Sequence, residues 1–230
     1  MAIIFKRKIY SRMLEWKNRF QGTTALLIQG ARRIGKSTIA EEFAKNEYET
    51  YMIIDFSIAG QELIELFNDI SDLDFFFLRL QNLTGKTLKP GKSVIILDEI
   101  QLCPKARQAI KHLVKDKRYE YIETGSLISI KKNVKDIIIP SEETRISMYP
   151  LDFEEFLWAI GKPSLYELIS YSFKNLKPLG ESVNRSILRD FRLYMLIGGM
   201  PQAIVEYLSK NNFEDVDYIK RNILELYSSD

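Results

Sequence analysis

One stretch of the chain carries the residue types that bind phosphate. The segment Gly30-Ala-Arg-Arg-Ile-Gly-Lys-Ser37 fills every fixed position of the pattern G-x-x-x-x-G-K-[ST]. An apolar run precedes this segment and a helical pattern follows it, so the loop ends at a helix N-terminus, where unpaired backbone N–H groups attract an anion. The sequence therefore predicts a phosphate-binding loop. The alternative is an ordinary glycine turn between a strand and a helix.

The residues of this loop have expected roles. The glycines let the backbone close around the anion. We expect Lys36 to reach the β- and γ-phosphates as a catalytic residue, and the Ser37 hydroxyl to be a ligand of Mg²⁺. The residues expected to bind the nucleotide are Gly30, Arg33, Ile34, Gly35, Lys36, Ser37 and Thr38.

A second stretch, from Ser93 to Glu99, ends in two acids after an unbroken apolar run. Such a run is typical of a central strand in a parallel sheet, and these sheets bind ligands beyond the carboxyl ends of their strands. We expect Asp98 to hold Mg²⁺, directly or through water, and Glu99 to orient and polarise the attacking water as a catalytic residue. The alternative is a strand that ends at two solvated acids.

Hydroxyls and arginines supply further candidates. The strand pattern that ends at Thr124-Gly-Ser126 places two hydroxyls where they would sense the γ-phosphate or hold the lytic water, although a capped turn explains them equally well. An arginine supplied by a neighbouring copy is a further expected catalytic group. The candidates are Arg145, which we include among the catalytic residues, and Arg185, Arg189 and Arg192, whose spacing also fits a solvated or salt-bridged helix face.

The composition limits the class of protein. A chain of 230 residues can form one large domain, or one domain with a smaller appendage, and its net charge of +2 gives no global field that favours nucleic acid. The single Cys103 excludes an internal disulfide framework, and with the single His112 it cannot form a zinc site unaided. The start of the chain has neither a secretory signal nor a membrane span, so we expect a soluble, cytoplasmic protein.

Hydrophobic periodicity predicts the elements that position these residues. In the first part of the chain we expect helices over residues 5–20, 36–45, 72–83 and 104–116, and strands over residues 24–29, 51–56, 93–98 and 119–126. From Leu151 onward the pattern is helical, with a break at Gly198-Gly-Met-Pro201. The prediction is an α/β core over residues 1–150, followed by a helical part over residues 151–230.

Five segments, taken in order, resemble those of the bacterial and archaeal AAA-family ATPases. They are the phosphate loop with its Arg-Arg pair, Ile95-Ile-Leu-Asp-Glu-Ile-Gln101, Thr124-Gly-Ser126, Tyr149-Pro-Leu-Asp-Phe-Glu-Glu-Phe-Leu157 and Gly198-Gly-Met-Pro-Gln202. The resemblance covers nearly the whole chain. It implies a P-loop NTPase fold of the AAA type, in which a parallel sheet flanked by helices precedes an all-helical lid or winged-helix-like segment, with ATP and Mg²⁺ as ligands.

Members of this family usually continue into a C-terminal domain of unknown function with a nuclease-like fold. Because the chain ends at Asp230, we expect that domain to be absent here.

Three functions fit these patterns. The leading interpretation is a Mg²⁺-dependent ATPase whose hydrolysis drives a conformational switch. The second is a scaffold that binds ATP without hydrolysing it and holds a protein or DNA partner. The third, a small-molecule kinase, is less favoured because the pair Asp98-Glu99 fits the activation of water better. We expect a nucleotide ligand and a protein partner or homo-oligomer; nucleic acid stays open.

Overall fold

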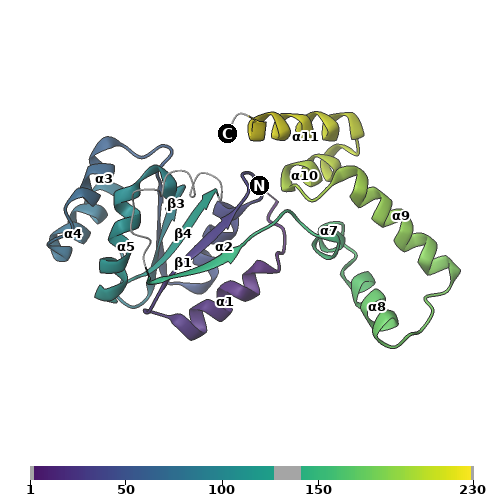
Figure 1. Ribbon diagram of the computed structural model, residues 1–230, viewed down its shortest axis with the longest axis horizontal. Helices are drawn as coiled ribbons and strands as arrows, with labels where there is room; N and C mark the ends of the chain where they lie inside the picture. Colours follow the sequence, from purple (N-terminus) through teal and green to yellow (C-terminus); the bar gives the residue numbers. More distant parts are fainter. Residues whose placement is uncertain (1–2, 127–140, 229–230) are drawn as a thin grey trace. The chain divides into compact units, whose positions relative to one another are not determined.

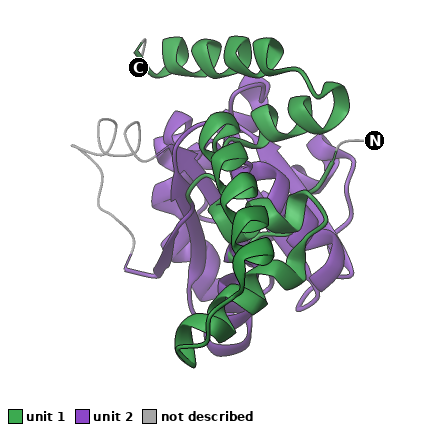
Figure 2. Ribbon diagram, turned by 90° about the vertical axis from the view of Figure 1, so that its right-hand side faces the viewer, with its two compact units in different colours: residues 1–8, 149–230 green, residues 9–148 purple. Residues whose placement is uncertain are grey.

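The computed structural model describes residues 3–126 and 141–228, which form two compact units (Figures 1 and 2). The core unit lies within residues 9–148, and the helical unit consists of residues 3–8 and 149–228. The sequence places the boundary after residue 150, whereas the structure divides the chain after Met148 and groups the first residues with the helical unit. The chain therefore passes between the units twice.

The core unit is built on a five-stranded sheet. Its strands are β1 (Ala25–Gly30), β2 (Thr50–Asp55), β3 (Ser93–Asp98), β4 (Glu120–Ser126) and β5 (Glu143–Ser147). The strand order is β2-β3-β4-β1-β5, and every neighbouring pair is parallel. The predicted α/β class with a parallel sheet is therefore confirmed. The sequence does not predict β5, because Ile146 is the one fully buried residue of this short, mostly polar strand.

Helices flank the sheet (Figure 1). The helices of the core unit are α1 (Ile9–Phe20), α2 (Lys36–Glu47), α3 (Gln61–Glu65), α4 (Leu73–Thr84) and α5 (Pro104–Asp116), with short 3-10 turns at Leu66–Asn68 and Ile100–Leu102. Apolar residues of α4 and α5 pack with the sheet into one core, which includes Leu27, Ile95 and Ile110. Every residue of β3 is buried, which explains its unbroken apolar run.

The first helix begins later than the sequence predicts. Residues 3–8 are not helical, because Arg7 and Lys8 bond instead to residues of the helical unit. Of the apolar positions spaced three or four residues apart that remain helical, Ile9, Met13 and Trp16 are buried, whereas Phe20 is 41% exposed. Tertiary contacts therefore override the helical pattern in its first turn.

The helical unit confirms the predicted helical second part. Its helices are α7 (Phe153–Ala159), α8 (Pro163–Lys174), α9 (Glu181–Ile197), α10 (Pro201–Lys210) and α11 (Phe213–Ser228). Helix α7 starts at a capping box made by Asp152 and Glu155. One cluster of buried apolar residues in the unit consists of Leu151, Phe156, Ile197, Ala203, Ile204 and Val216. In the described part of the chain, no helix has the length and apolar character needed to cross a membrane.

Candidate functional site

The loop between β1 and α2 turns at two residues with positive φ. Arg33 has a φ of 61° and Gly35 a φ of 93°, both in the left-handed region. Gly35 is the N-cap of α2, so no side chain caps this helix, and its first turn carries no acidic residue. The positive end of the helix dipole at this position favours an anion. The loop therefore has the backbone features of a phosphate site.

Gly30, the first residue of this loop, is required by close packing. A Cβ at Gly30 would lie 2.3 Å from the carbonyl oxygen of Met148 and 2.7 Å from Cδ1 of Ile34, distances that Cβ atoms do not adopt. Ile34 is fully buried. The first glycine of the pattern thus lets β1 pass beneath the loop and beside the chain that follows β5.

Lys36 lies folded back on the loop. Its Nζ donates to the carbonyl oxygens of Ala31 at 2.7 Å and Gly30 at 3.2 Å, and the residue is 5% exposed. Burial lowers the pKa of this amine, and the nearby carboxylates of Glu99 and Asp98 offset part of that effect. The ammonium therefore lies at the loop, close to both acids.

Two predicted hydroxyl residues meet at the carboxylate of Asp98. The Ser37 hydroxyl donates to Asp98 Oδ1 at 2.8 Å, and the Thr124 hydroxyl donates to the same oxygen. Asp98 is 7% exposed and Thr124 is fully buried, while Ser37 is exposed to solvent. A carboxylate and two hydroxyls thus converge at the surface of the loop, with the Ser37 side open to a ligand.

Glu99 follows Asp98 at a turn in the chain. Its φ of 54° is left-handed, and its backbone N–H donates to the Thr124 hydroxyl at 3.4 Å. Its carboxylate accepts a hydrogen bond from the side-chain amide of Gln101, a residue that the sequence patterns do not identify as part of the site. Thr124 therefore bridges the two acids, and Gln101 orients the second one.

The strand order explains why these residues meet. Strand β4 lies between β3 and β1, and its last residue, Ser126, pairs in register with Gly30 at the end of β1. On the other side, Leu97 of β3 pairs with Glu123 of β4. The carboxyl ends of the three strands therefore reach the same edge of the sheet, as expected for a ligand site in a parallel sheet.

The remaining predicted cofactor-binding residues differ in exposure. Arg33 and Thr38 are exposed, whereas Ile34 is fully buried and acts through its packing against Gly30. Ser126 is 4% exposed and lies beside Gly30 in register. The structure therefore brings all the predicted loop residues and both hydroxyls to one region.

Arg145 lies apart from this region. It is on β5, in register with Leu27, and its guanidinium pairs with Glu143. Glu143 pairs in register with Ala25, the first residue of β1, whereas the loop follows the last residue of that strand. Within one chain the guanidinium is therefore directed away from the loop, and a role in a neighbouring copy stays a prediction.

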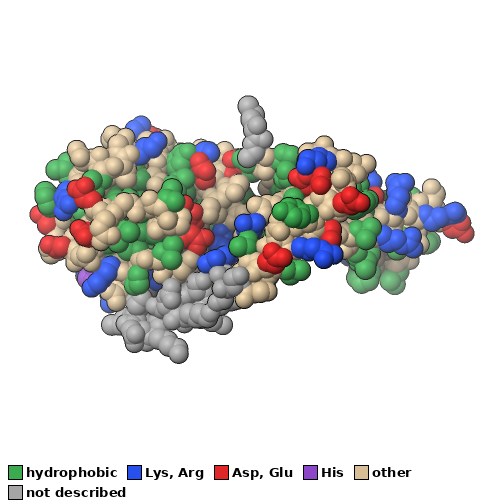
Figure 3. All heavy atoms as spheres, turned by 90° about the horizontal axis from the view of Figure 1, so that it is seen from above, with side chains coloured by type: hydrophobic (Ala, Val, Ile, Leu, Met, Phe, Trp, Pro, Cys, Tyr) green, Lys and Arg blue, Asp and Glu red, His purple; other side chains and the backbone are tan. Residues whose placement is uncertain are grey.

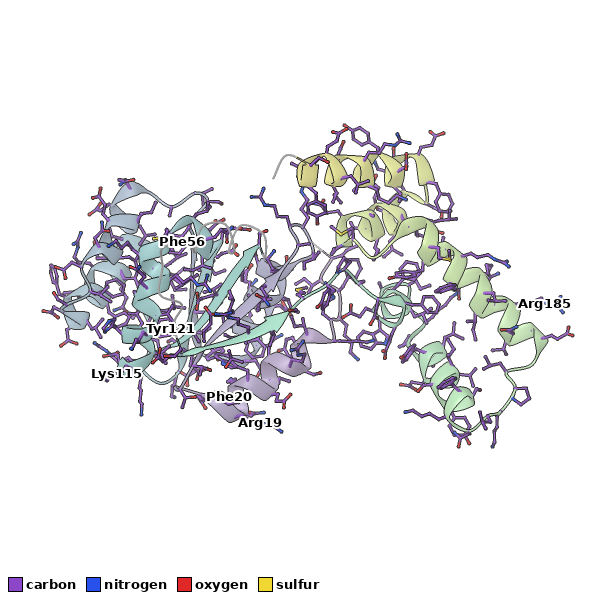
Figure 4. The ribbon with its side chains drawn as sticks, in the orientation of Figure 1. Arg19, Phe20, Phe56, Lys115, Tyr121 and Arg185 are labelled. Carbon is purple, nitrogen blue, oxygen red and sulfur yellow. The ribbon has the colours of Figure 1, made fainter. Side chains whose placement is uncertain are left out.

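The other three arginine candidates lie on α9. Arg185 extends from this helix (Figure 4) and pairs with Glu181 at 2.8 Å, and Arg189 approaches Asp190 at 4.0 Å. Arg192 is exposed on the same helix. Acidic and basic side chains are intermixed on the face of the molecule shown in Figure 3. The paired arginines match the salt-bridged helix face that the sequence left open.

A buried charge cluster lies among β4, β5 and α5. Arg107 of α5 pairs with Glu143 at 3.1 Å, and their side chains are 2% and 0% exposed. Glu123 is fully buried, and neither of its carboxylate oxygens has a hydrogen-bond partner among the described residues. Burial, with the neighbouring Glu143 carboxylate, raises the pKa of Glu123 to about 8. Sequence periodicity does not reveal this cluster.

The oxygen donors at Asp98 fit Mg²⁺. This ion is usually bound by one or two carboxylates together with substrate phosphates, and hydroxyl oxygens are suitable ligands. In residues 3–126 and 141–228, no three His, Cys, Asp or Glu side chains gather into an all-protein metal site. Asp98 and Ser37 would therefore hold the ion together with the phosphates of a bound nucleotide.

Comparisons with known proteins match the same region. A family model described as AAA domain matches residues 22–157. A curated relative, one of the subunits of the ATP-dependent helicase/deoxyribonuclease of Clostridium perfringens, is 23% identical over 176 residues, which cover 72% of this chain and 15% of the relative. The solved structure of C. elegans PCH-2 aligns with a TM-score of 0.42 and 11% identity, over 96% of this chain and 65% of that one. The chain spans less than two thirds of the length of either protein.

Proposed function

The chain belongs to the AAA domain family, and on this premise we propose that it is a Mg²⁺-dependent ATPase that uses hydrolysis as a conformational switch. The observation that carries the proposal is the 2.8 Å hydrogen bond between Ser37 and Asp98. It joins the end of the phosphate loop to the acidic end of β3. These are the two halves that ATP hydrolysis requires in a P-loop site.

The proposed roles follow from the positions of the side chains. Lys36 turns from the carbonyl oxygens that it now contacts to the β- and γ-phosphates. Glu99 polarises the attacking water, and its bond from Gln101 orients the carboxylate. Thr124 and Ser126 report the presence of the γ-phosphate. When bound, Mg²⁺ neutralises charge on the phosphate oxygens.

The identity of the nucleotide belongs to the same proposal. The name of the C. perfringens relative describes an ATP-dependent protein, which favours ATP as the nucleotide.

We propose a second copy of this chain, or another protein, as the partner of the switch. The proposed location is the cytoplasm, and Arg145, Arg185, Arg189 and Arg192 remain the candidates for an arginine that acts in a neighbouring copy.

The substitution Glu99→Gln tests the proposed reaction. It keeps the size of the side chain and the Thr124 contact, which uses the backbone of residue 99, but removes the base. We expect steady-state phosphate release to fall by about 10²-fold or more, with the affinity for a fluorescent ATP analogue unchanged. The control is Glu49→Gln, at a partly exposed carboxylate paired with Lys89 and Lys92, which should hydrolyse ATP at the wild-type rate.

Two results would overturn the proposal in different ways. Unchanged hydrolysis by Glu99→Gln would remove Glu99 from the reaction. Tight ATP binding with no turnover in the wild-type protein would instead favour the scaffold interpretation. A salt series with DNA then tests that scaffold directly, because affinity for phosphates falls steeply as salt rises.

A further inference from the structure

Two short stretches of chain join the units. One passage lies between Lys8 and Ile9, and the other lies between Met148 and Tyr149. We call residues 148–151, which contain the second passage, the connector. Its two ends are bonded to different units, and at each end the connector itself contributes backbone atoms to the contacts.

The core end of the connector lies on the strand that carries the phosphate loop. The Met148 N–H donates to the Gln29 carbonyl at 2.8 Å. The Met148 carbonyl faces Gly30 so closely that any Cβ there would lie 2.3 Å from its oxygen. The Gly30 carbonyl also accepts a bond from Lys36. The first residue of the loop is thus in direct contact with the first residue of the connector.

The helical end of the connector is held as closely. The Leu151 N–H donates to the Gly199 carbonyl at 2.7 Å, and the Leu151 carbonyl accepts from the Tyr194 hydroxyl at 2.9 Å. A Cβ at Gly199 would lie 2.1 Å from the Leu151 oxygen. This contact explains the second glycine of the Gly198-Gly-Met-Pro201 break, a motif for which the nucleotide site provides no role.

Arg7 ties the two passages together. Its Nη2 donates to the Tyr149 carbonyl at 2.6 Å, and its Nε pairs with Glu155 at 3.2 Å. Both side chains are 6% exposed. The Lys8 N–H also donates to Glu155, at 2.6 Å. Residues from the first passage are therefore bonded to the first residue after the second passage and to the start of α7.

We propose that the two passages form one braced hinge, in which Arg7 is the brace and the connector carries changes at the phosphate loop into the helical unit. Two chain segments that join the same two units, and are tied together, allow fewer directions of motion than one free segment, because a backbone rotation in one passage must also be compatible with the other. The transmission step rests on the proposed nucleotide binding, since phosphates would draw Lys36 away from the Gly30 carbonyl that lies beside the connector. The brace itself does not rest on it.

Pulsed electron paramagnetic resonance on doubly labelled protein tests the hinge. Labels are placed by Arg19→Cys in the core unit and Arg185→Cys in the helical unit, both exposed (Figure 4). The background is Cys103→Ala, which removes the native buried cysteine. Without nucleotide, we expect Arg7→Ala to broaden the distribution of label-to-label distances. The matched control is Arg12→Ala, at an exposed arginine of α1, which should leave the width unchanged.

Circular dichroism checks that each variant is folded. If Arg7→Ala unfolds, Arg7→Lys is measured instead, because it keeps a cation for Glu155 but lacks the guanidinium fork that also reaches Tyr149. An unchanged width in a folded Arg7 variant overturns the brace.

Adding an ATP analogue with Mg²⁺ tests transmission, with its binding measured separately by fluorescence. We expect the analogue to shift the distance distribution of the wild type, and the Arg7 variant to bind it with equal affinity but to lose the shift. An absent shift in nucleotide-bound wild type overturns transmission, and a retained shift in the variant overturns the role of the brace in it. If the wild type binds no nucleotide, the proposed function and transmission fail, and the widths measured without nucleotide still decide the brace.

Discussion

Ser37 and Asp98 share a hydrogen bond of 2.8 Å across 61 residues of sequence. The strands that position them, β1 and β3, are not neighbours, because β4 lies between them. The contact therefore depends on the order of the sheet, and Thr124 of β4 completes it by donating to the same carboxylate. Motifs that are separate in the sequence become one site through this relationship.

Lys36→Met should abolish stabilisation by nucleotide with little effect on the free protein. The amine is buried and its pKa is lowered, so burial of an apolar side chain of similar length offsets much of the loss of its bonds to the Gly30 and Ala31 carbonyls. At ATP concentrations about 100 times the Kd, ligand binding adds about 2.7 kcal/mol to the free energy of unfolding. Thermal unfolding with and without ATP and Mg²⁺ should show this gain in the wild type and in the exposed control Lys45→Met. A similar gain in Lys36→Met would contradict the assigned role.

Thr124→Val should lower turnover and raise the Mg²⁺ concentration that turnover requires, while the fold is kept. The isosteric change removes the hydroxyl that bridges Asp98 and the backbone of Glu99. We expect turnover to fall by about tenfold, the equivalent of one hydrogen bond to a charged group, and to need more Mg²⁺. The control is Thr50→Val, whose hydroxyl pairs with Ser93 at the other end of the sheet. Equal Mg²⁺ titrations for the two variants would show that the bridge has no role.

Gly30→Ala should destabilise the core unit even without nucleotide. The added methyl group would overlap the Met148 carbonyl, which is backbone and cannot turn away. We expect a loss of about 1–3 kcal/mol in the free energy of unfolding, as for other overpacked sites. Gly60→Ala is the control, because a Cβ there meets open space and its φ is −66°. Urea unfolding that gives both variants the same midpoint would argue against this packing.

Glu123 should make the protein less stable as the pH rises. Its pKa is raised to about 8 in the folded state by burial and by Glu143, so between its ordinary value of 4.5 and 8 the folded state holds a proton that the unfolded state releases. The stabilising contribution is complete below pH 4.5 and is lost as the pH rises through 8. Urea unfolding at several pH values should show a shallower decline for Glu123→Gln than for wild type. The exposed control Glu62→Gln should follow the wild type, and an unchanged slope in Glu123→Gln would contradict the shift.

The sequence was sufficient for the local features. The phosphate loop needs residues at fixed spacing within one turn, and the central strand β3 is buried on both faces, so its unbroken apolar run is visible without any partner. The predicted helices and the four predicted strands are present because their hydrophobic patterns are also local features of the sequence. Strand β5 was missed because it is an edge strand with one fully buried residue, which leaves almost no hydrophobic pattern.

Only the tertiary structure decided which of the distant groups meet. The bridging role of Thr124, the bond from Gln101 to Glu99 and the direction of Arg145 away from the loop all depend on strand order and register. The first helical turn was lost because Arg7 makes buried bonds to the helical unit instead. Spacing along the chain determines local conformation, whereas contacts between distant residues depend on how the elements pack. The contacts that Thr124 makes with Asp98 and Glu99 are of the second kind.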